Sequence, residues 1–282
     1  MFRERYDAMT GGKGRLMLFA GDQKVEHLND DFHGKGIAPD DGEPEHLFRI
    51  ASRGRIGAFA TQFGLIARYA ADHPKVPYVV KLNSKTNLVK PLQAEPLSRQ
   101  WLAVDEVAAL RDENDLNVVG VGYTVYLGSE HEAVMLTEAA QLVHRAHRFG
   151  LAAILWMYPR GRSVPDEKDP HIIAGAAGAG ACLGADFVKL NYPKGPDAGE
   201  RFKEAVRAAG PAWCAPEEAA WRRGRSLRGS MSRWRPAPWA APPAGTYTRS
   251  RWTRPRGSAM PSTPSRSTAP RSVRPWACTG GI

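Results

Sequence analysis

One lysine in this sequence lies inside an apolar run and is placed to do covalent chemistry: Lys189, in the segment FVKLNY. Side chains alternate along a strand, so Phe187, Lys189 and Asn191 would share one face, with Val188 and Leu190 on the other. If that face lines a barrel interior, burial or a neighbouring cation lowers the pKa of a lysine amine, and the neutral amine can form a Schiff base. The alternative, which the pattern supports equally, is a lysine whose ammonium group reaches solvent at a strand edge.

Two aromatic residues and an arginine occupy alternate positions in the segment WMYPRG. Trp156 and Tyr158 have the same parity, so both would face the barrel interior beside Lys189. A phenol can donate or accept a proton, which suits a catalytic tyrosine. Packing in an ordinary apolar core is the alternative for both rings. Arg160 would lie at the rim, where it would either bind a phosphate group or remain solvated.

Polar residues also end two other apolar runs. Asp22 ends the run LMLFAGD, where its carboxylate could orient or deprotonate a substrate hydroxyl; a turn or helix cap is the alternative. Lys81 and Asn83, in the segment KLNSKTNL, have the same geometry at the end of another run. They are therefore candidate substrate-binding residues, together with Arg160 and Asn191.

The segments that carry these residues alternate with helical segments along residues 1–210. Strand-like apolar runs lie at residues 16–22, 56–62, 78–83, 118–126, 152–158 and 187–192. Amphipathic stretches typical of helices lie at residues 44–53, 63–72, 100–113, 129–149, 169–184 and 198–209. Strands that alternate with helices predict βαβ units and a parallel sheet.

Six such units predict most of a (β/α)8 TIM barrel, an α/β fold in which eight units take about 250 residues. Catalytic residues of such barrels lie at the carboxyl ends of the strands, which is where Lys189, Tyr158 and Asp22 would lie. A doubly wound sheet is the alternative, but no GxGxxG turn follows the first strand. We therefore expect an incomplete TIM barrel over residues 1–210, followed by an irregular tail over residues 211–282.

Length and composition limit the class of protein. The chain has 282 residues, of which 43% are hydrophobic, enough for a sizeable core. Its mean hydropathy is −0.41, and no apolar run is long enough to span a membrane. The N-terminal segment MFRERYDAMTGG has no apolar stretch typical of a secretory signal, and three cysteines do not make a disulfide framework. We therefore expect a soluble, reduced, cytoplasmic protein.

The net charge of +10 belongs to the last quarter of the chain. Residues 211–282 contain 13 Arg, no Lys and two acidic residues, whereas residues 1–210 contain 26 basic and 27 acidic residues. The tail also holds six of the eight Trp and 11 of the 22 Pro, and it shows neither helical nor strand periodicity. A basic, unstructured tail that binds nucleic acid is one explanation.

Motifs for a metal or cofactor do not occur in the sequence. Among the histidines only His144 and His147 are closely spaced, and they have no acidic or cysteine partner nearby, so no zinc site is expected. GxSxG and Walker motifs do not occur either. We therefore expect chemistry that depends on side chains, with no cofactor and no metal.

Five segments together resemble the archaeal-type class I fructose-bisphosphate aldolase family: AGDQKVEHLNDDF, VKLNSKTNL, VGVGYTVYLGSE, WMYPRG and GADFVKLNYPK. The resemblance covers about residues 5–210, with six strands in order. It implies a TIM barrel with Lys189 as the Schiff-base lysine, Tyr158 and Asp22 as catalytic residues, and Trp156 as the neighbouring tryptophan. The first strand ends in GDQ where the family commonly has DHG, a difference that bears on the register of Asp22.

The resemblance implies cleavage of fructose 1,6-bisphosphate to dihydroxyacetone phosphate and glyceraldehyde 3-phosphate without a metal. Lys189 would attack the C2 carbonyl and Tyr158 would move protons. Transaldolase-like sugar synthesis and acyl transfer are alternative Schiff-base reactions on the same barrel, and a nucleic-acid binder with a basic tail is a third alternative. The resemblance also implies a phosphorylated sugar as partner and a homo-oligomer, with no membrane and no specific nucleic acid as partners.

Translation out of frame explains the tail. Codons built from the last base of each codon and the first two bases of the next permit VVCAGGSSV from residue 212 and GSATGRNIHQKPLDE from residue 239. These are phrases expected of the family's phosphate-binding loops. At the junction of Trp252 and Thr253 only one shifted codon is possible, and that codon encodes Asp. We therefore expect a frame change near codon 210 that removes strands seven and eight and impairs the activity of the chain as written.

Overall fold

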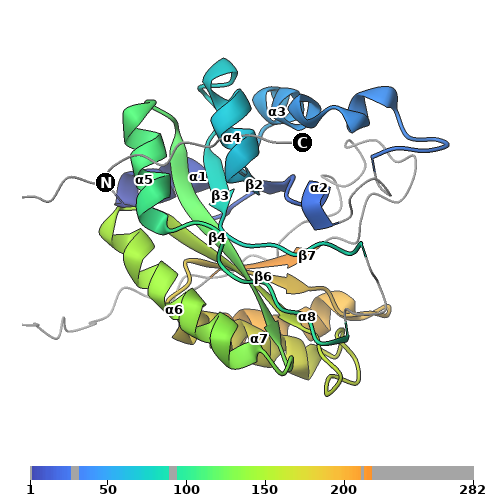
Figure 1. Ribbon diagram of the computed structural model, residues 1–282. Coiled ribbons are helices and arrows are strands. Elements are labelled where there is room, and N and C mark those ends of the chain that lie inside the picture. The colour runs from blue at the N-terminus through green and yellow to red at the C-terminus, as the bar shows by residue number, and fades with distance from the viewer. Residues whose placement is uncertain (1, 27–31, 89–93, 211–212, 218–282) are drawn as a thin grey trace, which may run out of the picture. The chain divides into compact units, whose positions relative to one another are not determined.

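A parallel sheet of seven strands forms the centre of the computed structural model, which describes residues 2–26, 32–88, 94–210 and 213–217 (Figure 1). The strands pair in sequence order and the sheet curls into a partial barrel. They are β1 (Leu18–Ala20), β2 (Ala58–Gln62), β3 (Tyr78–Lys81), β4 (Val118–Leu127), β5 (Ala152–Pro159), β6 (Phe187–Asn191) and β7 (Trp213–Glu217). The predicted α/β class and barrel-type fold are confirmed.

Helices alternate with the strands and cover the outer face of the sheet (Figure 1). They are α1 (Phe2–Thr10), α2 (Gln23–Glu26), α3 (Pro44–Arg53), α4 (Phe63–Tyr69), α5 (Val104–Glu113), α6 (Glu132–Arg148), α7 (Pro170–Cys182) and α8 (Ala198–Ala209), with short 3-10 helices η1 (Pro39–Gly42) and η2 (Ala70–Asp72). Every strand-like and helix-like segment expected from periodicity contains an element of the expected type. Among the described residues, no helix is long and apolar enough to cross a membrane.

The seventh strand is a difference from the sequence analysis, which counted six strands and placed the end of the barrel at residue 210. β7 pairs in parallel with β6, with Cys214 opposite Val188 and Pro216 opposite Leu190. Pairing of strands uses backbone groups, so an irregular side-chain pattern does not prevent it. Proline has no N–H to donate, and it is tolerated here because β7 ends the described sheet. The parallel sheet therefore extends to residue 217.

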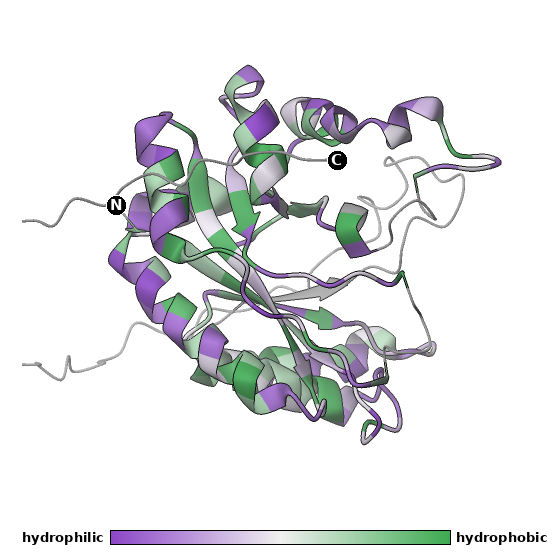
Figure 2. Ribbon diagram, in the orientation of Figure 1, coloured by the Kyte–Doolittle hydropathy of each residue, from purple (hydrophilic) through white to green (hydrophobic). Residues whose placement is uncertain are grey.

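Strand β5 is buried on both faces, as are β4 apart from Leu127 and β6 apart from the partly exposed Lys189, as expected of a parallel sheet covered by helices. Figure 2 shows most of their length as hydrophobic, with polar residues on the outer helices α5 and α6. A Cβ atom built on Gly180 of α7 would lie 3.0 Å from a methyl carbon of Val188 and 3.2 Å from Cγ of Met157. Val188 therefore faces the helices, as the alternation predicted, which leaves the opposite face of β6 for Lys189.

Helix α1, which periodicity did not predict, packs at the amino ends of β5 and β6. Tyr6 stacks on Phe187 with ring centroids 5.4 Å apart. The Arg5 guanidinium donates to the carbonyl oxygens of Phe149 and Gly150, at 3.2 and 2.8 Å. Because these contacts join residues more than 140 positions apart, they were not visible in the local pattern of the sequence.

The close approach of α7 to the sheet generates a stability prediction. Gly180→Val adds three carbons where Val188 and Met157 already lie within 3.2 Å of the missing Cβ position. We expect the free energy of unfolding to fall by about 1–3 kcal/mol from overpacking, measured by urea titration with circular dichroism.

The matched control is Gly175→Ala on the same helix, where a Cβ meets no atom within 4 Å. Alanine is the better helix former, so this variant should gain about 0.5–1 kcal/mol. Equal losses in the two variants would contradict the packing argument.

Candidate active site

The residues predicted for catalysis lie at the carboxyl ends of the strands. Since all the strands are parallel, these ends share one edge of the sheet. Asp22 follows β1, Lys81 ends β3, Trp156 and Tyr158 lie in β5, and Lys189 lies in β6. Strand pairing places Trp156 directly opposite Lys189. The structure therefore brings together residues that are up to 167 positions apart in the sequence.

The indole ring of Trp156 lies within reach of two lysine ammonium groups. Its centroid is 4.6 Å from Nζ of Lys81 and 5.7 Å from Nζ of Lys189, distances at which cation–π attraction operates. Nζ of Lys189 is also 5.9 Å from the ring centroid of Tyr158. The indole is 2% exposed, and its Nε1–H has no hydrogen-bond acceptor among the described residues. This buried donor is therefore left without an acceptor in the described part of the chain.

Gly122 of β4 makes room for this indole. A Cβ atom at Gly122 would lie 2.6 Å from Cζ3 of Trp156 and 3.2 Å from Cδ of Lys81. Neither side chain could keep its present position beside an alanine. Because Gly122 has no side chain, the Trp156 ring and the Lys81 side chain can both lie against this part of β4.

Lys81 and Asp22 form a buried ion pair beneath the indole. Nζ of Lys81 donates to Oδ2 of Asp22 at 3.0 Å and to Oγ1 of Thr124 at 2.7 Å. The Lys81 side chain is fully buried and that of Asp22 is 8% exposed. An ammonium group in such a place is stable only when its charge and its hydrogen atoms are matched, as they are here.

Two opposing effects set the protonation of Asp22. Burial alone would raise the pKa of its carboxyl group, but the charges of Lys81 and Lys189 and the hydrogen bond from Lys81 together bring that pKa below its usual value. Asp22 is therefore a carboxylate at neutral pH. It can accept a hydrogen bond or a proton from a hydroxyl group.

The two asparagines predicted to bind substrate hydrogen bond to neighbouring backbone. Nδ2 of Asn83 donates to the carbonyl oxygens of Ser98 and Thr124, each at 2.9 Å, and its Oδ1 accepts from the Thr124 amide at 2.7 Å. Nδ2 of Asn191 donates to the carbonyl oxygen of Glu167 at 3.1 Å. These bonds give both residues a structural role, and their contact with substrate stays a prediction.

Arg160 lies at the rim, where the sequence placed it. Its Nε and Nη2 donate to the two carboxylate oxygens of Glu167, at 2.8 and 2.9 Å. Its guanidinium carbon is 5.6 Å from the ring centroid of Tyr126, and that ring is 6.5 Å from the ring of Tyr158. Arg160 is therefore connected through Tyr126 to Tyr158, one of the two aromatic residues predicted for catalysis.

Sequence reasoning missed three residues of β4 that shape the site: Gly122, Thr124 and Tyr126. The available signal was their common parity, since alternate residues of one strand share a face. Their registers with β5 place Thr124 opposite Trp156 and Tyr126 opposite Tyr158. An inward row of glycine, threonine and tyrosine could thus have been predicted, although its partners could not.

Within the described part of the chain, no three His, Cys, Asp or Glu side chains gather where they could hold a metal ion. Nε2 of His147 instead lies 3.0 Å from Oδ2 of Asp186. That hydrogen bond, with the charge of Asp186, raises the pKa of His147 despite its burial.

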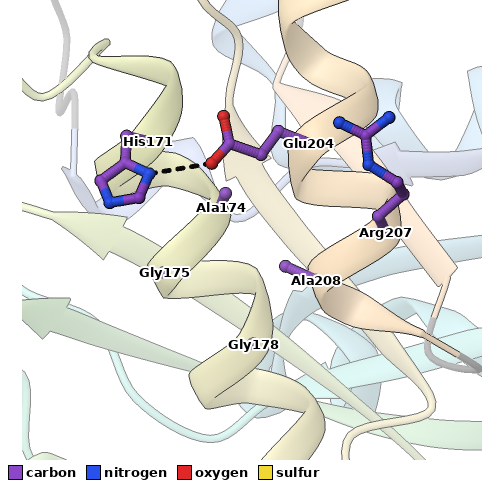
Figure 3. A pocket seen from close by; sticks show the side chains of 7 residues that line it. All are labelled: His171, Ala174, Gly175, Gly178, Glu204, Arg207 and Ala208. Atoms are coloured by element: carbon purple, nitrogen blue, oxygen red, sulfur yellow. Dashed lines mark hydrogen bonds and ion pairs between the residues drawn. The ribbon is translucent and has the colours of Figure 1, made fainter.

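A pocket on the outer helices lies apart from these residues. Figure 3 shows it between α7 and α8, with Nδ1 of His171 2.9 Å from Oε1 of Glu204. None of the residues predicted for catalysis lines it. The lining residues are His171, Ala174, Gly175, Gly178, Glu204, Arg207 and Ala208.

Comparison with known proteins gives a consistent result. The model of the DeoC/LacD aldolase family matches residues 16–212. A Methanocaldococcus jannaschii protein named fructose-bisphosphate aldolase/6-deoxy-5-ketofructose 1-phosphate synthase is 60% identical over 207 residues, 73% of this chain and 66% of that protein. The class 1 fructose-bisphosphate aldolase of Thermoproteus tenax is 33% identical over 207 residues, 73% of this chain and 72% of that protein.

Solved structures agree in sequence and in fold. A fructose-bisphosphate aldolase from Slackia heliotrinireducens is 56% identical with a TM-score of 0.73, covering 76% of this chain and 69% of its own. A second structure is that of an archaeal fructose-1,6-bisphosphate aldolase with its catalytic lysine bound to a carbinolamine intermediate. It is 32% identical with a TM-score of 0.65, and the match covers 77% of this chain and 79% of that chain. This chain belongs to the DeoC/LacD family of aldolases.

Proposed function

We propose that this chain is a class I aldolase that cleaves fructose 1,6-bisphosphate through a Schiff base on Lys189. The observation that carries the proposal is the placement of the Lys189 amine, 5.7 and 5.9 Å from the ring centroids of Trp156 and Tyr158. The names of the relatives support the substrate. The carboxylate of Asp22, whose pKa Lys81 and Lys189 help to lower, supplies a base beside the amine.

The first step joins Lys189 to the sugar. Its Nζ attacks the C2 carbonyl to give a carbinolamine, which loses water to become an iminium ion. The Tyr158 hydroxyl supplies the proton with which the C2 oxygen leaves as water. The Trp156 Nε1–H, which has no acceptor among the described residues, is the proposed donor to a substrate oxygen in this step. The positive iminium nitrogen then attracts electrons from the neighbouring carbon.

In the second step the C3–C4 bond breaks. The C4 hydroxyl proton passes to a base, for which Asp22 is the candidate, and C4 leaves as the aldehyde carbon of glyceraldehyde 3-phosphate. The electron pair of the C3–C4 bond moves into an enamine whose nitrogen belongs to Lys189. The proton held by Asp22 passes through Tyr158 to C3. Addition of water at C2 then releases dihydroxyacetone phosphate, restores the amine and returns a proton to Tyr158.

A second candidate reaction is supported by the Methanocaldococcus jannaschii relative, whose name includes 6-deoxy-5-ketofructose 1-phosphate synthase. Transaldolase-like synthesis would use the same Lys189 enamine, transferred to a different carbonyl acceptor. A homo-oligomer and a cytoplasmic location remain proposals that rest on the resemblance to this family.

The assignment of Lys189 is tested by reductive trapping. Incubating the chain with dihydroxyacetone phosphate and sodium borohydride should add one reduced triose phosphate per chain, seen by mass spectrometry. Lys189→Met should abolish the adduct, because it removes the only amine proposed to form it.

Two further variants separate chemistry from structure. Lys203→Met, at a partly exposed position on α8, should keep the adduct. Tyr158→Phe keeps the amine, so the same adduct should still form but more slowly, and cleavage should slow by about 10²-fold or more, the usual size of proton-transfer catalysis. An adduct on the Lys189→Met chain would contradict the assignment.

The ion pair beneath the site is tested by stability against pH. Asp22→Asn leaves the buried Lys81 ammonium without its counter-charge, so the free energy of unfolding at pH 7 should fall by about 3 kcal/mol. The folded-state pKa of Asp22 lies below the unfolded value of about 3.9. The stabilisation is therefore full above that value and is lost as the pH falls through the lower, folded pKa.

Urea titrations at pH 7 and in acid give the free energy of unfolding of the unaltered chain and of the Asp22→Asn variant. The difference between these two free energies should shrink at low pH. Asp72→Asn, at an exposed carboxylate of η2, is the control and should change stability by under about 0.5 kcal/mol. A loss of equal size at both pH values would contradict the role of charge.

We also propose that residues 211–282 are translated out of frame and that the parent gene encodes a complete barrel. The end of the family match at residue 212 supports this proposal. Sequencing the gene across codons 200–220 tests it. A restored base that continues the frame as Val-Val-Cys-Ala-Gly-Gly is the expected result, and an unchanged frame would overturn it.

A further inference from the structure

Asp22, the candidate base, lies just beyond the end of a very short strand. β1 contains only three residues and ends at Ala20. The Gly21 amide still donates to the carbonyl oxygen of Ala60 in β2, at 2.8 Å. Beyond this bond, side chains from the neighbouring strands make the contacts that hold Asp22.

The end of β2 holds the backbone of Asp22. Nε2 of Gln62 donates to the carbonyl oxygen of Asp22 at 2.9 Å, and Oγ1 of Thr61 donates to the carbonyl oxygen of Gly21 at 3.2 Å. Gln62 is the last residue of β2. Its side-chain amide thus continues the contact between β2 and the first strand after the regular pairing has ended, and it restrains the backbone from which the carboxylate projects.

Strand β4 holds the carboxylate of Asp22 through Lys81. Nζ of Lys81 donates to Oδ2 of Asp22 at 3.0 Å and to Oγ1 of Thr124 at 2.7 Å. A lysine side chain has a flexible stem, so one hydrogen bond alone does not fix where its ammonium group lies. Thr124 is 1% exposed, and its hydroxyl gives the ammonium group a second, immobile acceptor.

The backbone of Thr124 is in turn fixed by a side chain that replaces a strand residue. β3 ends at Lys81, whereas β4 continues to Leu127. Beyond the end of β3, Oδ1 of Asn83 accepts from the Thr124 amide at 2.7 Å, and its Nδ2 donates to the Thr124 carbonyl oxygen at 2.9 Å. An amide side chain can make both kinds of bond that a neighbouring backbone would make. Thr124 therefore stays in register although its partner strand has ended.

Position matters to Asp22 as much as charge does. The positive charge of Lys81 favours the ionised carboxylate without fixing where that carboxylate lies. A base must also lie within about 2.6–3.2 Å of the oxygen whose proton it takes. A displacement of about 1 Å can cost about 10²-fold in rate. The proposed transfer of the C4 hydroxyl proton to Asp22 thus depends on the groups that hold the carboxylate.

We propose that Thr124 and Gln62 are positioning residues for Asp22: Thr124 fixes its carboxylate through Lys81, and Gln62 fixes its backbone. Neither side chain needs to touch the sugar in this role. The inference rests on the proposed function and adds the residues on which cleavage of the C3–C4 bond depends. Schiff-base formation on Lys189 does not use Asp22, so that step is insensitive to both residues.

The test measures two rates for each variant. One is the cleavage of saturating fructose 1,6-bisphosphate, and the other is the formation of the borohydride-trapped adduct with dihydroxyacetone phosphate. Thr124→Val removes the acceptor and Gln62→Met removes the donor, each at similar size. Each should lower the ratio of cleavage to trapping by about tenfold or more. Thr124→Ser, which keeps the hydroxyl, should restore most of the ratio.

Matched controls lie on helix α6. Thr137→Val and Gln141→Met make the same exchanges at exposed positions, and neither should change the ratio. Each ratio is internal to one variant, so a partial loss of folded protein lowers both rates equally and cancels.

A second arm shows whether the two residues act through Asp22. Thr124→Val and Gln62→Met are each combined with Asp22→Asn. Two changes that act on one group are not additive. Each added change should therefore alter the ratio of the Asp22→Asn chain by less than about twofold. A loss as large as in the unaltered chain would mean that the residue acts independently of Asp22, which overturns the inference.

The remaining outcomes separate this inference from the proposed function. Unchanged ratios in Thr124→Val and Gln62→Met overturn the inference and leave the Schiff-base function standing. Equal losses in Thr124→Val and Thr124→Ser overturn the role of the hydroxyl. A normal ratio in Asp22→Asn also overturns the inference, because cleavage then needs no carboxylate to be held. If the unaltered chain neither traps dihydroxyacetone phosphate nor cleaves the bisphosphate, the proposed function is overturned and the inference falls with it.

Discussion

The buried ion pair between Lys81 and Asp22 is the interaction on which the site depends. Two charges in a protein interior are stable only if each finds a partner and the remaining hydrogen bonds are satisfied. Thr124 supplies the second acceptor for Lys81, and Trp156 covers the ammonium group. Because the pair joins the end of β1 to β3, across β2, it fixes the first strand of an open sheet.

A chain of hydrogen bonds connects this pair to the outer helices. The Tyr123 hydroxyl donates to Glu138 of α6 at 2.6 Å and lies 3.2 Å from the carbonyl oxygen of Ser98. Asn83 donates to that same oxygen and also pairs with the backbone of Thr124. These bonds link the carboxylate of Asp22, through Lys81 and Thr124, to helix α6 on the far side of the sheet. Rigid support of this kind is what the proposed catalytic role of Asp22 would require.

The sequence predicted elements better than it predicted partners. Period-two alternation identified the strands and the face of β6 that carries Lys189, because both properties are local. It could not show that Lys81, expected to bind substrate, donates to Asp22, which is 59 positions away. Nor could it show that Gly122 must lack a side chain, since that follows from the place of the Trp156 ring. Burial of a charged side chain predicts that a partner of opposite charge exists, but only the three-dimensional structure identifies the residue that supplies it.

Amine chemistry and phosphate binding are carried by different parts of a barrel, and this chain separates them. The residues around the Lys189 amine come from the ends of β1, β3, β4, β5 and β6, all before residue 210. Barrels of this type bind a phosphate with loops after strands seven and eight, and those positions follow β7, outside the described residues. The proposed carbonyl chemistry would thus depend on strands that are in place. In the proposed complete barrel, affinity for the phosphate nearest the Schiff base would come from the loops after strands seven and eight, so the two properties could be lost independently.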